Sequence, residues 1–227
     1  MNLVSVYQYQ PLERHTEPSG DRHYVSPNGD KLSSVTTILS NTGEPKKQLI
    51  EWRERVGDRK AEQEKQEAVR LGSLMHTHLE RYILGAPRPG GNNYGRLLAE
   101  RMADQIIHRG LVHIDEVWGS EVMLYTPRLF AGTTDLVGCY KGEPAIIDFK
   151  TAKKLRSRDM IEDYFLQLGA YGIAHDELYD TRIQTGVIFM VSRDCQFQEF
   201  VVEREDFKAY QLRFIARLKQ FLDRSPP

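Results

Sequence analysis

Cysteine is scarce in this chain, which contains only Cys139 and Cys195 among 227 residues. The two do not form a Cys-x-x-Cys pair, and two thiols cannot provide the four ligands of a structural zinc site or an iron–sulfur cluster. Nothing in their spacing indicates the disulfide framework of a secreted domain, so two reduced thiols are the favoured interpretation. We therefore expect no iron–sulfur cluster.

Long apolar runs are also missing, since no stretch approaches the ~20 residues that a membrane-spanning helix needs. The segment from Met1 to Gln8 has neither a basic start nor the apolar core of a signal peptide. Glu13 and Glu17 follow closely, and early acidic residues are unusual in organelle transit peptides. These absences lead us to expect an intracellular, cytoplasmic protein without a membrane partner.

A surplus of one charge is absent as well, because 31 basic and 32 acidic residues leave a formal net charge of −1. Overall charge therefore does not indicate nucleic-acid binding, which would depend on a local basic patch. The hydrophobic content of 40% and the charged content of 28% are those of an ordinary folded domain. A chain of this length can form one substantial core, alone or with a modest appendage.

The N-terminal half predicts a β-hairpin followed by helices. The turn signal Ser26-Pro27-Asn28-Gly29 separates two short strand-like runs, and Val4 and Val6 alternate with polar neighbours as in a strand. Mixed charges over 62–70 predict an exposed helix that protrudes from the core. The expected elements are strands over 22–25 and 30–32 and helices over 33–39, 46–84 (broken near Gly57) and 94–109.

The C-terminal half alternates between strand and helix patterns. The expected elements are strands over 117–125, 130–140, 145–149, 186–191 and 197–202 and helices over 161–179 and 206–222. This order predicts an α/β fold in which helices flank a mixed sheet. We expect residues 1–110 to form a hairpin and helical region that packs on, or arches over, a core of residues 111–227, in one continuous structural unit.

Two aspartates are the most informative residues of the chain. Asp135 lies within a predicted strand, three residues after Gly132, and Asp148 ends another strand after two isoleucines. Carboxylates are depleted in strands and costly to bury without a partner. Two of them on adjacent strands repel each other unless a cation lies between them, and oxygen ligands suit Mg²⁺ or Mn²⁺. Such an ion polarises a phosphoryl oxygen and lowers the pKa of an attacking water.

Lys150 follows Asp148 by two residues, so on a strand both side chains lie on the same face. Its ammonium can stabilise the charge that develops on phosphoryl oxygens or orient a water. For these two residues alone, a simple surface ion pair is the better interpretation, because such short motifs arise by chance. The addition of Asp135 and of the residues that follow favours a functional site.

His76 lies on a predicted helix and shares one face with Gly72 and Glu80. A neutral imidazole on this face could bind the metal, and Gly72 would let the helix approach the sheet. Glu80 could bind the metal through a water or hold His76. A lone inward histidine is more often a core residue, but the nearby acidic pair favours a ligand.

Gln167 and Tyr171 lie one helical turn apart, so both could reach a phosphate or an active-site water, although Tyr171 alone could equally belong to the core. A basic run follows Lys150 and consists of Lys153, Lys154, Arg156 and Arg158. Such a run is usually a solvated loop, but its place beside the predicted metal site makes it a candidate track for backbone phosphates.

Four patterns occur in a fixed order, namely Gly-x-x-x-His, Gly-x-x-Asp, Asp-x-Lys and Gln-x-x-x-Tyr. In this order they resemble the RecB-type branch of the PD-(D/E)xK nuclease superfamily. Within it, the run Ser34 to Leu39, Trp52 and the run Arg55 to Gly57 are similar to the subgroup of mitochondrial genome maintenance exonucleases and phage exonucleases. The resemblance extends over 33–171. It implies a restriction-endonuclease-like fold with an N-terminal helical arch that admits single-stranded DNA.

The resemblance also implies roles for individual residues. The implied metal ligands are His76, Asp135, Asp148 and the backbone carbonyl of Phe149. The implied catalytic residues are Lys150, Asp135 and Asp148, with Gln167 and Tyr171 completing the site. Ser34 and Thr36, in the run that is similar to this subgroup, are candidate DNA contacts together with the basic run. Two features depart from the pattern: Thr134 stands where the family name has proline, and the arch region has mixed rather than basic charge.

The leading hypothesis is a DNA exonuclease that uses one or two Mg²⁺ or Mn²⁺ ions and prefers single strands or free ends. One alternative is a structure-selective endonuclease or nickase, and another is an inactive nucleic-acid-binding module. No helicase domain fits in 227 residues, so a helicase, polymerase or single-strand-binding protein would have to supply unwinding. A phage origin is suggested by the resemblance alone.

Overall fold

The computed structural model describes residues 1–43 and 47–224. Its centre is a five-stranded sheet with the order β4-β5-β6-β7-β8, in which β6 and β7 run parallel and the other neighbours antiparallel. The strands are β4 (Ile114–Thr126), β5 (Phe130–Tyr140), β6 (Glu143–Ala152), β7 (Thr185–Ser192) and β8 (Phe197–Glu203).

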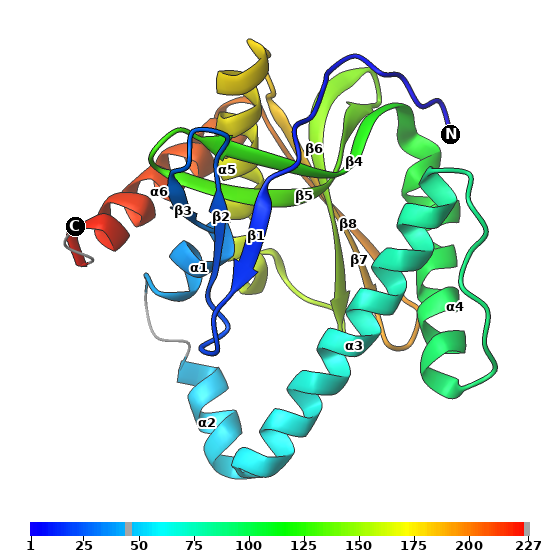
Figure 1. The fold of residues 1–227 in the computed structure, drawn as a ribbon. Coiled ribbons are helices and arrows are strands. Elements are labelled where there is room, and N and C mark those ends of the chain that lie inside the picture. Colours follow the sequence, from blue (N-terminus) through cyan, green and yellow to red (C-terminus); the bar gives the residue numbers. More distant parts are fainter. Residues whose placement is uncertain (44–46, 225–227) are drawn as a thin grey trace.

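Two pairs of helices cover the two faces of this sheet (Figure 1). Alternation along β6 directs Ile146 into the cluster with α5 and α6 and Ile147 into the cluster with α3 and α4. The helices are α3 (Asp58–Ile83), α4 (Tyr94–Arg109), α5 (Glu162–Tyr179) and α6 (Arg204–Arg224), with short helices η1 (Leu111–His113) and η2 (Arg158–Ile161). The predicted α/β fold with a mixed sheet flanked by helices is thus confirmed. None of the described helices is long and apolar enough to cross a membrane.

A smaller antiparallel sheet packs through Tyr24 and Leu32 against Ala131 of β5. Its strands are β1 (Glu13–Thr16), β2 (Arg22–Val25) and β3 (Lys31–Ser33). Two further helices are α1 (Val35–Ser40) and α2 (Lys47–Val56). Figure 1 shows α2 and α3 as a V that extends away from the main sheet. The predicted helix start at Lys46 lies outside the described residues.

The register of the main sheet creates an opening beside β6. The β5–β6 ladder ends at the pair Leu136–Ile147, whereas β6 stays paired with β7 as far as Ala152 and Ser192. On its other side, β5 stays paired with β4 as far as Phe130. The two strands therefore diverge just where each carries an aspartate.

The N-terminal residues depart from the predicted β-structure. Strand β1 is missing from the prediction because its four residues are polar and exposed, so no apolar alternation marks it. Pairing with β2 defines it instead. Val4 and Val6 predict a strand, but this segment forms an isolated bridge in which Leu3 pairs with Val117.

The same N-terminal segment packs an aromatic cluster against the end of α5. His175 is fully buried there and contacts the rings of Tyr7, Tyr9 and Trp118. Its Nε2 lies 3.0 Å from the Tyr9 hydroxyl, and its Nδ1 lies 2.7 Å from Thr181 Oγ1. Burial lowers the pKa of His175 to about 4, so the imidazole is neutral at neutral pH.

We expect mild acid to destabilise the fold through His175. The pKa is about 4 in the folded state and ~6.5 in the unfolded chain, so the unfolded chain takes up the proton first. The free energy of unfolding should therefore fall as the pH drops from about 6.5 to about 4, by up to about 3 kcal/mol. Urea unfolding across this range measures the slope. His175→Gln does not titrate there and should flatten the slope; an unchanged slope would contradict the assignment.

Candidate active site

The candidate site lies where β5 and β6 diverge. Asp135 comes from β5, and Asp148 and Lys150 come from β6, on the face that Ile146 shares with α5. Both aspartates are buried. Asp135 Oδ2 accepts a 2.6 Å hydrogen bond from the Phe149 backbone N–H, which links the two strands across the opening.

Helix α3 brings His76 to the same place. A Cβ added at Gly72 would lie 3.6 Å from Thr151 Oγ1, so the helix passes in contact with the end of β6. One turn later, His76 Nδ1 lies 3.2 Å from Asp135 Oδ1. The predicted close approach at Gly72 is therefore present, and it places an imidazole beside the first aspartate.

The charges of these groups are strongly coupled. Burial acts to lower the pKa of His76, but Asp135 outweighs it and raises that pKa to about 9. Burial acts to raise the pKa of Asp135, but His76 and Lys150 outweigh it and hold that pKa below its ordinary value. For Asp148, burial dominates and raises the pKa to about 6, despite Lys150. Without a cation, the site therefore favours the ionised form of Asp135 and disfavours the ionised form of Asp148.

Lys150 is positioned by two contacts. Its ammonium pairs with Asp148 Oδ2 and lies 5.0 Å from the centre of the Tyr164 ring, close enough for a cation–π interaction. Burial acts to lower its pKa, but Asp148 and then Asp135 outweigh that effect and raise it. Lys150 therefore stays protonated at neutral pH and serves as a fixed positive charge.

Gln167 and Tyr171 of α5 are both buried, and the Gln167 amide donates a 3.0 Å hydrogen bond to the Tyr171 hydroxyl. The Tyr171 ring packs against Gly132 of β5, where a Cβ would lie 2.6 Å from ring atom Cε1. The structure therefore places this pair beneath the strand that carries Asp135. Their contribution to the reaction stays a prediction.

Gly132→Ala is expected to disturb the site through Tyr171. A Cβ at 2.6 Å from Cε1 and 2.9 Å from the hydroxyl forces a buried ring to move, and overpacking of this kind costs about 1–3 kcal/mol. Thermal unfolding should show that loss. In the double variant Gly132→Ala, Tyr171→Leu, the smaller side chain removes the ring, so the two effects should be clearly non-additive. Additive losses would contradict the contact.

The donor atoms fit a divalent cation. His76, Glu121 and Asp135 each offer one ligand atom, and these atoms lie within 4.8 Å of one another. Asp148 Oδ2 is buried, and the Lys150 ammonium lies against it. Carboxylate oxygens with one imidazole nitrogen suit Mg²⁺ or Mn²⁺. An ion would displace the proton of His76, because only a neutral imidazole binds metal.

Glu121 of β4 is missing from the predicted site residues. Its backbone has φ 53°, a conformation rare outside glycine. Burial and then Asp135 raise its pKa to about 7. Its place within a strand could have marked Glu121 as a site candidate, as it marked Asp135. However, β4 also carries Asp115 and Glu116, so this signal does not single out Glu121. Glu80 lies outside this group of ligand atoms, and its charge helps to raise the pKa of Glu121.

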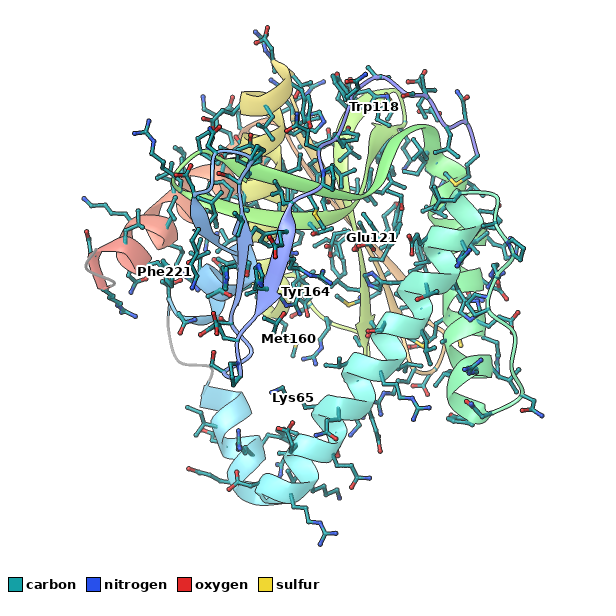
Figure 2. The ribbon with its side chains drawn as sticks, viewed as in Figure 1. Lys65, Trp118, Glu121, Met160, Tyr164 and Phe221 are labelled. Atoms are coloured by element: carbon teal, nitrogen blue, oxygen red, sulfur yellow. The ribbon has the colours of Figure 1, made fainter. Side chains whose placement is uncertain are left out.

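The predicted DNA contacts differ in how free their side chains are to bind a ligand. Ser34 is buried and its hydroxyl caps α1, which leaves the exposed Thr36 as the residue open to a ligand. Lys153 pairs with Glu64 of α3 at 3.0 Å, and Arg158 donates to the Val201 carbonyl at 3.2 Å. Lys154 and Arg156 are exposed. In the view of Figure 2, Glu121 and Tyr164 are labelled between β1 and α3, and Lys65 is labelled between α2 and α3.

A mixed sheet that opens to present two aspartates, a lysine and a histidine is the arrangement of a hydrolytic nuclease. The sequence agrees with this class, because the family model described as the PD-(D/E)XK nuclease superfamily matches residues 49–225. The chain belongs to this superfamily. Its fold is accordingly restriction-endonuclease-like, as the resemblance implied, and nucleases of this superfamily use divalent metals. The RecB-type subgroup stays a prediction.

Two crystal structures are similar to this chain at low identity. A candidate exonuclease from Eubacterium rectale has a TM-score of 0.49 and 10% identity, covering 68% of this chain and 65% of its own length. A phage-related exonuclease from Haemophilus somnus has a TM-score of 0.38 and 14% identity, covering 67% of this chain and 80% of its own length. The chain thus spans less than two thirds of the first protein. No curated protein sequence matches the chain.

Proposed function

We propose that this protein is a divalent-metal-dependent DNA exonuclease that hydrolyses phosphodiester bonds and prefers single strands or free ends. The observation that carries the proposal is the convergence of Asp135, Asp148, Lys150 and His76 in one opening of the sheet. Three separate elements supply these groups. Two buried carboxylates side by side are costly in a purely structural role, which favours a site that neutralises them with a cation.

The positively charged and negatively charged side chains of the site have different roles. Lys150, held between Asp148 and the Tyr164 ring, presents a positive charge to the phosphoryl oxygens, where negative charge grows during hydrolysis. Asp135 is oriented by the Phe149 N–H and by His76, so its carboxylate is fixed before substrate binds.

The residues that would hold the metal are His76, Asp135, Asp148 and Glu121, with the Phe149 carbonyl as a further candidate. A bound ion would supply a water of lower pKa and a positive charge against the scissile phosphate. Glu80 is a candidate for an outer position, through a water.

A preference for single strands is supported by the V of α2 and α3, which stands beside the small sheet on the side of the molecule where α3 brings His76 to the site (Figure 1). The contact between Lys153 and Glu64 ties this V to the end of β6. We propose that a strand passes between the V and the sheet, with Thr36, Lys154 and Arg156 near its phosphates. Unwinding of duplex DNA would then fall to a partner protein.

A linear and a circular single strand of the same sequence provide the test. With Mg²⁺ or Mn²⁺, the purified protein is expected to shorten the end-labelled linear strand progressively and to leave the circle intact; chelator should stop the reaction. Strands blocked at the 5′ or the 3′ terminus then give the polarity. Rapid cleavage of the circle would establish an endonuclease instead. Binding without cleavage under every divalent metal would identify an inactive binding module.

A further inference from the structure

A cavity of about 540 Å³ lies on the opposite side of α3 from the candidate active site. Its walls come from α3, from the start of α4 and from the turn after β7, and the residues that matter are Arg70, Leu71, Leu74, Tyr94, Leu98 and Arg193. The α3 residues recur at helical spacing and form one stripe, whereas Gly72 and His76 form another stripe about half a turn away. The helix therefore separates the cavity from the metal-binding groups.

The cavity has an apolar floor of leucine side chains and a solvent-exposed tyrosine ring at its mouth. In the floor of the cavity, Leu71 and Leu98 are buried and Leu74 is half-buried. Tyr94, the first residue of α4, is 81% exposed. Large aromatic side chains usually bury most of their surface, so a tyrosine left open at the mouth of an apolar cavity is available to stack on a flat ligand.

The charge at the rim is positive. Arg70 and Arg193 both line the cavity, and neither guanidinium forms an ion pair with any side chain that the structure describes. The acidic group at the rim is Glu67, whose carboxylate accepts a hydrogen bond from Gln63 at 3.2 Å. Two unpaired guanidinium groups beside an apolar, aromatic slot favour a ligand that is flat at one end and anionic at the other.

Two elements, the end of β6 and helix α3, connect the cavity with the candidate active site over short distances. The Arg193 backbone N–H donates a 3.0 Å hydrogen bond to the carbonyl of Ala152, two residues beyond Lys150 on β6. Arg70 precedes His76 by six residues, about 9 Å along the axis of α3. A strand bound at the site that continues around α3 would therefore meet this cavity within a short distance.

We propose that the cavity holds one nucleotide of the strand whose phosphodiester bond lies at the candidate active site. The base stacks on Tyr94 above the leucine floor, and Arg70 and Arg193 bind the adjoining phosphates. This inference rests on the proposed function, since it takes a nucleic-acid strand as the ligand. It assigns the outer face of α3 a role in holding that strand after it has passed the site.

Binding of a fluorescein-labelled oligodeoxythymidylate, measured by anisotropy in chelator, tests the proposal without any catalysis. Tyr94→Ala is expected to weaken binding about tenfold, as the loss of one base-stacking contact does. Tyr94→Phe should bind like the wild type, because it keeps the ring. Arg193→Gln should weaken binding and reduce the salt dependence of log Kd by about 0.7. An abasic strand should be insensitive to Tyr94→Ala but still sensitive to Arg193→Gln.

Matched controls are available on the same two helices. Tyr82→Ala removes an exposed tyrosine of α3, and Arg101→Gln removes an exposed arginine of α4. Neither residue lines the cavity, so both variants should bind like the wild type. Hydrolysis of bis(p-nitrophenyl) phosphate, which has no further nucleotide, should be unchanged by Tyr94→Ala. A wild type that binds the strand through Tyr94 but never cuts would refute the nuclease and leave the cavity assignment intact. A wild type that cuts, with Tyr94→Ala and Arg193→Gln binding as tightly as the controls, would overturn the assignment.

Discussion

Lys150→Ala is expected to lower the rate of DNA hydrolysis by about 100- to 1000-fold while strand binding is largely kept. The ammonium is a preorganised charge, because it is confined between Asp148 and the Tyr164 ring and stays protonated. Such a group acts mainly where charge develops in the transition state, so kcat should fall far more than KM rises. Single-turnover cleavage of an end-labelled strand measures the effect.

Two controls keep this result interpretable. Lys208→Ala removes an exposed lysine of α6 and should leave the rate unchanged. Circular dichroism of Lys150→Ala checks the fold, since this change leaves the Asp148 carboxylate without its ammonium partner. A folded Lys150→Ala variant that cuts within about tenfold of the wild type would remove Lys150 from the catalytic role.

The second large effect concerns the metal and needs no substrate. Mg²⁺ or Mn²⁺ at about 100 times its Kd should stabilise the wild type by about 2.7 kcal/mol. For a domain of this size, the melting temperature should rise by about 5–10 °C. Asp135→Asn should abolish this rise, because it removes the carboxylate that lies against both His76 and Phe149. Thermal unfolding with metal and with chelator gives the comparison.

Two further variants define the ligand set. Glu121→Gln should reduce the metal-induced rise, because Glu121 offers one of the three clustered ligand atoms. Asp206→Asn removes an exposed carboxylate of α6 and should leave the rise unchanged. If Asp135→Asn retained the full rise in melting temperature, the metal site would have to be placed elsewhere.

Much of the fold follows from local sequence patterns. The helix over 94–109 and the strand over 130–140 have the bounds that the structure gives to α4 and β5. These elements could be predicted because their apolar residues recur with a short, regular period and turn residues mark both ends. Strand β1 escaped prediction because it is polar throughout and exists by pairing with β2.

Within the site, the sequence predicted two pairs of residues that share a face, but it did not identify one candidate metal ligand. Asp148 and Lys150 share a face because strands repeat every two residues, and Gly72 and His76 share one because they lie a helical turn apart. Glu121 could not be singled out, because β4 carries several acidic residues and the sequence does not reveal its φ of 53°. Ser34, by contrast, belongs to a recognisable pattern, yet folding buries its hydroxyl as a helix cap.

The order of strands and helices and the candidate acidic pair were determined by the amino-acid sequence, since each depends on residue type and short spacing. Only the tertiary structure decided which carboxylates meet, how far burial raises the pKa of Asp148, and that Tyr94 and Arg193 share a cavity. The physical reason is that periodicity is local, whereas burial and charge coupling depend on how segments distant in the chain pack together.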